Sequence, residues 1–269
     1  LITERPPYPS FLNPVPALER DLFFILFLFS FNIYAQRIDP KKTDPKKTDP
    51  ISKNQNNQTT DELVKHLSAA ETYQISGDLI NAAAENRTIV GIGLQRTGNI
   101  AIEEGHYNDA VGILSESINY LDSAAARTNL AVAYLRQNQL DKALKEAQTA
   151  VAMDPKYSFA RYILGNIYFT REDYKSALPQ LEKVLILAPD FDSAHALGLT
   201  YLHLKQPERA RLLFEEMQSS FGKKNSPDLH ILFGQAYEKT NFPLEAEREF
   251  KLALAKNPKQ PRASFFLGY

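Results

Sequence analysis

Small and apolar side chains in the last two thirds of the chain recur at a regular interval. Five alanines, Ala110, Ala143, Ala177, Ala210 and Ala246, stand 33, 34, 33 and 36 residues apart. An interval of this length accommodates two antiparallel helices and two short turns. The pattern therefore predicts an all-α fold built from tandem helix pairs.

A second series lies twelve positions before these alanines and consists of small residues, four of them glycines. Glycine costs about 1 kcal/mol relative to alanine inside a helix, so its return indicates a close crossing of the two helices of each pair. A tyrosine follows three positions later in four of the five repeats, and in three of them a proline ends the second helix. The residues of these series are Gly98, Ala131, Gly165, Gly198 and Gly234, then Tyr134, Tyr168, Tyr201 and Tyr237, then Pro155, Pro189 and Pro258.

This combination of positions resembles the tetratricopeptide repeat family. The third repeat carries it most completely, with Leu164 and Gly165, then Tyr168, then Ala177, and a closing Pro189. The resemblance extends over residues 91–269, and it implies a right-handed α-solenoid with five repeats over 91–260. Within the third repeat, Pro179 predicts a kink or a late start of the second helix, because proline removes a backbone donor there.

The chain before the repeats divides into three parts. Residues 1–36 form an atypical N-terminus with a signal-like apolar segment, and residues 37–60, with the doubled motif DPKKT, are expected to be a disordered linker. Residues 61–90 predict a degenerate opening repeat whose second helix fuses with the next helix. Residues 261–269 begin a further repeat, which predicts that the natural chain continues beyond Tyr269.

The apolar run Leu22–Ala35 is shorter than the roughly 20 residues that a membrane-spanning helix needs. Its length and the small residue at its end favour a secretory signal with cleavage near Ala35, which would make the protein periplasmic or secreted. A short membrane anchor and an untranslated or misread segment are the alternatives.

Composition and motifs indicate no catalytic, metal-binding or cofactor-binding residues, and the protein is not expected to be an enzyme. The chain has a net charge of −1, so its composition does not indicate a basic surface for nucleic acid. It has no cysteine, so no thiolate chemistry is available. The five histidines lack metal-ligand spacing. The stretch TIVGIGLQRTG could alternatively be a strand entering a phosphate loop, but its glycine spacing fits neither common fingerprint.

Two functions agree with these observations. The first is a non-enzymatic scaffold that binds an extended, partly apolar peptide or partner protein in a concave groove lined by the first helices, rather than an acidic carboxy terminus. The second is the recognition arm of a larger exported protein, with a catalytic or second binding domain after residue 269. The resemblance places groove candidates at offsets two, five, nine and twelve of the repeats. They are Phe159, Tyr162, Asn166, Phe169, His195, Leu199, Leu202, Ile231 and Gln235.

Overall fold

The computed structural model describes residues 50–220 and 226–267, with side chains from Asp61 onward. Every element in these ranges is an α-helix, as the periodicity predicts. The described residues form two compact units, one of residues 50–97 with 115–121 and one of residues 98–114, 122–220 and 226–267. The boundary between the units falls within α3 (Leu79–Glu103) and α4 (Tyr107–Tyr120).

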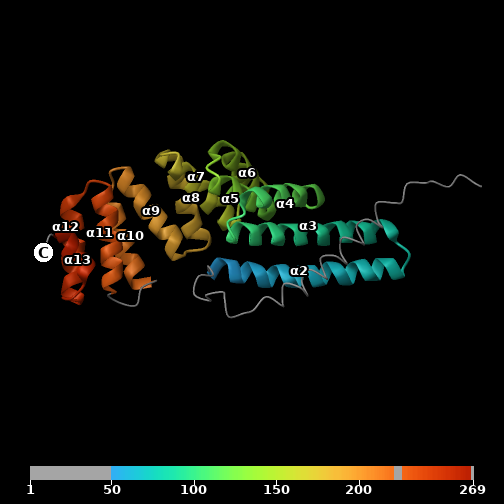
Figure 1. Cartoon of the computed structure of the whole chain (residues 1–269), viewed down its shortest axis with the longest axis horizontal. Helices are drawn as coiled ribbons and strands as arrows, with labels where there is room; N and C mark the ends of the chain where they lie inside the picture. Colours follow the sequence, from blue (N-terminus) through green and yellow to red (C-terminus); the bar gives the residue numbers. More distant parts are fainter. Residues whose placement is uncertain (1–49, 221–225, 268–269) are drawn as a thin grey trace, which may run out of the picture. The chain divides into compact units, whose positions relative to one another are not determined.

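In the first unit, α2 (Pro50–Ile75) and α3 run antiparallel and are joined by a short turn (Figure 1). Gly77 adopts a φ of 78° in this turn, and the Asp78 carboxylate accepts a hydrogen bond from the backbone N–H of Asn81. The continuous helix α3 also contains the stretch TIVGIGLQRTG, so the alternative interpretation of these residues as a strand and a phosphate loop is wrong.

Helix α2 begins earlier than the sequence indicates. The composition of residues 50–60 predicts a disordered linker, but these residues are helical in the structure. Proline at the first helical position and the asparagines and glutamines that follow it are compatible with a helix, although they give no apolar periodicity. Residues 1–49, with the apolar run Leu22–Ala35, lie outside the described part of the chain.

The second unit consists of helix pairs of nearly constant length. The first helices are α5 (Ala124–Arg136), α7 (Ser158–Thr170), α9 (Phe191–His203) and α11 (Pro227–Lys239), each of 13 residues. The second helices are α6 (Leu140–Met153), α8 (Tyr174–Leu187), α10 (Pro207–Ser220) and α12 (Pro243–Lys256), each of 14 residues. A short helix, α13 (Pro261–Leu267), follows. Consecutive helices pack against each other from α5 to α10 and from α11 to α13, and so do consecutive first helices from α5 to α11. Stacking of the Phe214 and Phe233 rings joins α10 to α11.

The turn inside each pair contains one residue in the left-handed region. Two of these residues are glycines, but four carry side chains, and their φ angles lie between 58° and 66°. The backbone N–H of the next residue then bonds to the carbonyl at the repeat tyrosine position, which satisfies an orphan carbonyl at the helix end. The turn residues are Gly77, Gly105, Asn138, Glu172, Lys205 and Asn241.

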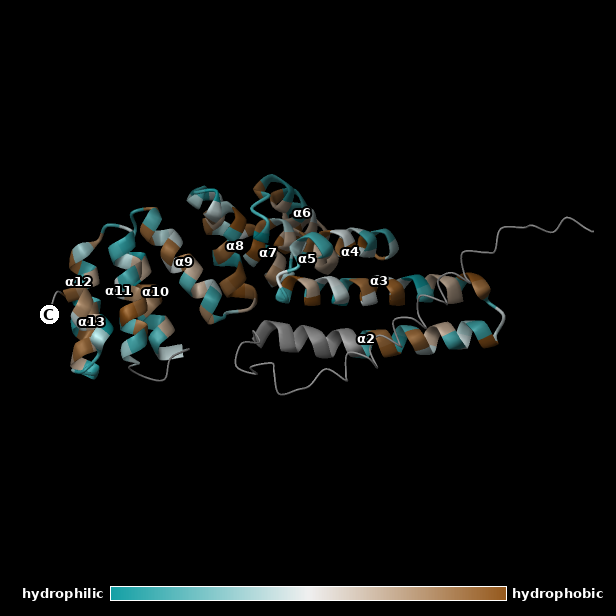
Figure 2. Cartoon of the chain, in the orientation of Figure 1, coloured by the Kyte–Doolittle hydropathy of each residue, from teal (hydrophilic) through white to brown (hydrophobic). Residues whose placement is uncertain are grey.

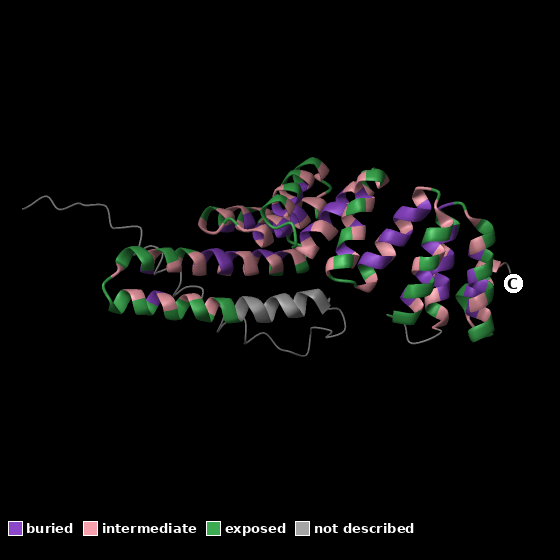
Figure 3. Ribbon diagram, turned by 180° about the vertical axis from the view of Figure 1, so that it is seen from behind, coloured by how far each residue is buried: buried purple, intermediate pink, exposed green. Residues whose placement is uncertain are grey.

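The repeat glycines lie where the two helices of a pair approach most closely. A Cβ atom on Gly198 would stand 2.2 Å from Cε1 of Phe214, and one on Gly165 would stand 2.8 Å from Cδ2 of Leu181. The five repeat alanines are all buried, and Figure 3 shows the buried positions on the faces that the array helices turn toward their neighbours. Close packing at this crossing therefore explains why larger side chains are absent there.

Pro179 neither delays nor ends its helix, because α8 begins at Tyr174 and runs through the proline.

Hydrophobic and hydrophilic residues alternate around the helices (Figure 2), and none of the helices in the described ranges is long and apolar enough to cross a membrane.

Candidate functional site

The first helices of the second unit present side chains at the same positions from one repeat to the next. Counting from the first residue of each first helix, position five is Tyr162 in α7 and His195 in α9, and position nine is Asn166 and Leu199. The side chains at these four positions are half-buried. Because α7, α9 and α11 pack against one another, their equivalent positions form one continuous surface, here called the first-helix face.

Helix α7 contributes the most aromatic part of this face. Phe159 and Tyr162 pack against the apolar cluster of Ala131 and Ile163, and Tyr162 also packs against the cluster that contains Leu197. Their rings are half-buried, so one side of each contributes to the core. The amide of Asn166 belongs to the same helix and adds a polar, half-buried group to this face.

Phe169 belongs to a cluster of three rings. Its ring meets Tyr174 edge-on at 5.2 Å and His203 at 5.3 Å, while Tyr174 and His203 stack at 4.2 Å. Burial, with a smaller contribution from Lys205, lowers the pKa of His203. Burial also raises the pKa of Tyr174. Phe169 therefore connects the end of α7 to the end of α9 as well as lining the face.

His195 occupies the equivalent of Tyr162 one repeat later. Its ring lies parallel to that of Phe191, with centroids 6.3 Å apart. Burial, and then the positive charge of Lys239 on α11, lower the pKa of His195. The imidazole is therefore neutral near neutral pH. Leu199 and Gln235 are half-buried at position nine of α9 and α11.

Two of the proposed groove residues do not lie on the first-helix face. Leu202 has no exposed surface, and Ile231 is only 3% exposed. Leu202 belongs to the apolar core of the later repeats, and Ile231 packs against Ala253 and Ala263. Equivalent offsets therefore do not guarantee equivalent exposure, because burial depends on which residues pack against each position. Both residues therefore stabilise the fold and cannot contact a partner.

Polar pairs separated by 19 residues connect the two helices of several repeats. Arg127 donates to Glu146 at 2.7 Å, Arg161 donates to Gln180 at 2.9 Å, and His230 Nδ1 lies 2.8 Å from Glu249 Oε2. The pair His66 and Glu85 has the same separation in the α2–α3 hairpin, with 2.5 Å between its atoms. The common spacing is a signal that the sequence contains, but the apolar periodicity alone does not reveal it.

The tyrosine hydroxyls connect neighbouring repeats. Tyr168 accepts a hydrogen bond from Gln148 Nε2 at 3.0 Å, and Tyr201 donates one to Glu182 at 3.0 Å. Both partners lie on the second helix of the preceding repeat. Burial and the Glu182 carboxylate raise the pKa of Tyr201 to about 12, so its hydroxyl remains protonated.

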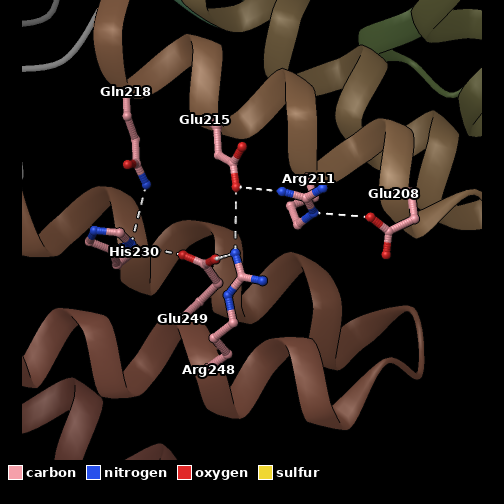
Figure 4. A network of polar contacts seen from close by, with 7 residues as sticks. All are labelled: Glu208, Arg211, Glu215, Gln218, His230, Arg248 and Glu249. Carbon is pink, nitrogen blue, oxygen red and sulfur yellow. Dashed lines mark hydrogen bonds and ion pairs between the residues drawn. The ribbon is translucent and has the colours of Figure 1, made fainter.

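The most extensive polar network lies among α10, α11 and α12 (Figure 4). Its buried centre is the pair His230 and Glu249, and Gln218 Nε2 lies 3.2 Å from the same His230 nitrogen. Arg248 lies 3.6 Å from Glu215 and 3.8 Å from Glu249, which extends the network between repeats. The network therefore holds the helices of successive repeats together. No cluster of three metal-ligating side chains occurs in the part of the chain that the structure describes.

Comparisons with known proteins agree with this architecture. Two tetratricopeptide repeat family models match the chain, one over residues 101–167 and the other over residues 162–228. The structure is also similar to that of YrrB, a TPR protein described as having an unusual peptide-binding site. The TM-score is 0.54 at 17% sequence identity, over 75% of this chain and 100% of that one. The chain is therefore a tetratricopeptide repeat protein, and repeats of this kind typically mediate protein–protein interactions without catalysis.

Curated relatives match parts of the chain. The heat-shock cognate co-chaperone sgt12 of Aspergillus fumigatus is 33% identical over 91 residues, which is 34% of this chain and 27% of the relative. Serine/threonine-protein phosphatase T of Trypanosoma brucei is 29% identical over 103 residues, which is 38% of this chain and 22% of the relative. The matches thus span about a quarter of each of these longer proteins.

Proposed function

We propose that this protein is a non-enzymatic scaffold that binds an extended, partly apolar segment of a partner protein on its first-helix face. The observation that carries this proposal is the row of half-buried aromatic, aliphatic and amide side chains at equivalent positions of α7, α9 and α11. Such a surface can bury apolar side chains of the partner while its amides bond to the partner's main chain.

The charges on the second helices contrast with this face. On α10, Arg211 bonds to both Glu208 and Glu215, and on α12 Lys251 pairs with Glu247. Side chains that are already paired in this way cover a solvated surface and offer little to a partner. The first-helix face is mostly uncharged, which favours an extended neutral segment over an acidic carboxy terminus.

Binding can be tested with a library of random linear peptides displayed on phage and selected on the purified chain. The variant Asn166→Ala with Gln235→Ala removes two amides from the first-helix face and leaves its apolar packing unchanged. We expect the affinity of selected peptides for this variant to fall about tenfold or more, as for the loss of one or two buried hydrogen bonds. The matched control is Lys145→Ala with Lys183→Ala, two exposed positions on α6 and α8. Equal loss in both variants would contradict the proposed site.

The short matches to longer relatives favour a second candidate function. We propose as the alternative that the repeats are the recognition region of a larger exported protein with a catalytic or second binding domain. Relatives such as the trypanosome phosphatase, of which the match spans 22%, support this alternative. Sequencing the complete transcript separates the two. A further folded domain encoded after residue 269 favours the recognition region, and a stop codon soon after it favours the scaffold.

Export remains a proposal that rests on the apolar run Leu22–Ala35. We expect cleavage near Ala35, so the mature protein in the periplasm or outside the cell should begin near Gln36. Mass spectrometry of the protein isolated from its native cells measures this directly. Intact residues 22–35 in cytosolic protein would contradict export.

A further inference from the structure

The turn that joins α2 and α3 carries three large aliphatic side chains that are mostly exposed. Ile75 is 88% exposed, Leu79 60% and Ile80 84%. All three lie within about one helical turn of Gly77, where the chain reverses direction. Figure 2 shows hydrophobic residues at the two helix ends that this turn connects. Residues 75–80 are here called the hairpin tip.

The equivalent turns in the rest of the chain carry polar residues at the same places. Gly77 corresponds to the five other turn residues with a positive φ, so Ile75 and Ile80 have five equivalents each. The equivalents of Ile75 are Glu103, Arg136, Thr170, His203 and Lys239, and those of Ile80 are Asn108, Asp141, Lys175, Glu208 and Leu244. This kind of turn therefore does not need aliphatic side chains at either position, and their presence together at the hairpin tip calls for a different reason.

The polar groups of the turn are bonded within the hairpin itself. The main-chain N–H groups of residues 76–79 all donate to carbonyls of residues 72–77. The Ser76 hydroxyl donates to the carbonyl of Tyr73 at 2.9 Å. The Asp78 carboxylate accepts from the main-chain N–H of Asn81 at 3.1 Å and from its Nδ2 at 2.6 Å. These donors can therefore enter an apolar medium without losing their partners, which is the condition that a lipid phase imposes.

This chemistry suits a lipid surface better than a protein surface. A specific protein interface surrounds its apolar centre with polar groups that bond across the interface. The hairpin tip has few such groups to offer, because its donors are already used within the turn. A bilayer asks for no hydrogen bond from an apolar element, which sinks about 5–10 Å into the boundary between headgroups and acyl chains. The three aliphatic side chains lie within that depth of the turn.

The charges near the turn indicate which kind of lipid surface is favoured. Anionic lipids attract segments rich in lysine and arginine, but residues 67–86 contain neither residue. Asp78 is the one charged residue of the hairpin tip, and it lies at the N-terminus of α3, where the helix dipole favours a carboxylate. A zwitterionic surface therefore fits the tip better than an anionic one.

We infer that the hairpin tip inserts into the surface of a bilayer of zwitterionic lipid. The contact is peripheral, made by a turn, and it adds a second interaction surface to the protein. It lies in the first compact unit and does not involve the first-helix face, so it is independent of the proposed binding of a partner segment.

Vesicle sedimentation measures this contact. The purified chain is mixed with phosphatidylcholine vesicles, and the bound fraction is determined after centrifugation. Ile75→Ser with Ile80→Ser should weaken partitioning into the vesicles about tenfold or more, because two aliphatic side chains no longer enter the lipid. The matched control is Ile186→Ser with Leu244→Ser, at side chains that are 74% and 76% exposed on α8 and α12. This control should bind as the unaltered chain does, and both variants should retain their helical circular dichroism.

The carboxylate at the tip provides a test in the opposite direction. Asp78→Asn removes the charge and keeps a side chain that caps a helix well, so the variant should bind phosphatidylcholine vesicles more tightly. Weaker binding of this variant would contradict insertion of the turn.

A fluorescent reporter can locate the contact, because the chain contains no tryptophan. Leu79→Trp should show a blue-shifted emission when phosphatidylcholine vesicles are added, and lipids brominated in their acyl chains should quench it. Leu244→Trp, at an exposed position of α12, should show neither change.

Several results would overturn the assignment of the tip to a lipid surface. If Ile75→Ser with Ile80→Ser binds vesicles as tightly as the unaltered chain, another part such as the apolar run Leu22–Ala35 makes the contact. If binding requires phosphatidylserine and is lost at high salt, the lysines of the DPKKT motifs make it. If vesicles do not bind but the same double variant dissociates an oligomer, the tip contacts a second copy of the chain. Loss of peptide binding with vesicle binding retained would overturn only the proposed function.

Discussion

Replacing Gly198 with alanine tests the close crossing that the repeat pattern implies. The new Cβ atom would stand 2.2 Å from Cε1 and 2.8 Å from Cζ of Phe214. The Phe214 ring cannot move aside easily, because it stacks on Phe233 at 4.3 Å and meets Tyr237 edge-on at 5.7 Å. Gly198→Ala therefore overpacks a rigid aromatic cluster.

Two opposing effects determine how much Gly198→Ala changes the free energy of unfolding. Alanine is favoured over glycine inside a helix by about 1 kcal/mol, whereas overpacking a close-packed core costs about 1–3 kcal/mol. Gly112 in α4 provides the matched control, because an added Cβ there meets nothing within 4 Å. Gly112→Ala should gain the helix propensity alone. The two variants should thus differ by about 1–3 kcal/mol in the free energy of unfolding.

Urea and thermal unfolding followed by circular dichroism at the helix band measure this difference. A difference of this size corresponds to roughly 2–12 °C in melting temperature for a chain of this length. Repeat arrays can unfold in stages, so coincidence of the thermal and urea transitions is the necessary check. If Gly198→Ala is as stable as Gly112→Ala, the glycine is not needed for the crossing and the packing argument is wrong.

Three further predictions concern single side chains. Glu172 has a φ of 61°, which strains any residue that carries a Cβ atom. Glu172→Gly should therefore be more stable than Glu172→Ala by about 1 kcal/mol in urea unfolding, the reverse of the order of helix propensity. The opposite order of stability would contradict the strain. Burial lowers the pKa of His195 and His203 below 6.5, so the unfolded chain binds the extra protons, and stability is complete above that value and declines as the pH falls. The melting temperature should therefore decrease on acidification, and less so when both histidines are replaced by phenylalanine. His230→Phe leaves the buried carboxylate of Glu249 without its nearest partner and should lower the free energy of unfolding by about 3 kcal/mol. Adding Glu249→Leu should restore much of that stability. If His230→Phe alone leaves the stability unchanged, the pair does not stabilise the fold.

The fold could be predicted from the sequence because its strongest constraint is steric. A crossing as close as that of Gly198 and Phe214 tolerates only small residues, so the constraint repeats in the sequence at the period of the helix pairs. The turns carry no comparable signal. Glu172 and Lys205 adopt left-handed conformations although neither residue type favours them, because the helix-end hydrogen bonds offset the strain.

The candidate site was predicted only in part, because exposure depends on the neighbouring repeats. Tyr162 and Asn166 are half-buried on a first helix, whereas the same offsets placed the buried Leu202 on the surface. Sequence spacing also could not show that Nε2 of His195 has no hydrogen-bond partner among the residues described with side chains, since hydrogen bonding depends on side-chain geometry.

Site-specific photo-crosslinking tests the central claim, that a partner segment binds to the first-helix face. A photoreactive phenylalanine analogue is placed at Asn166 on α7, and in a separate protein at Lys183 on the exposed side of α8. Each protein is irradiated with a fluorescein-labelled peptide selected on the unaltered chain. The account predicts a crosslinked product from position 166 that excess unlabelled peptide suppresses, and none from position 183. Crosslinking from position 183 but not from position 166 would contradict it.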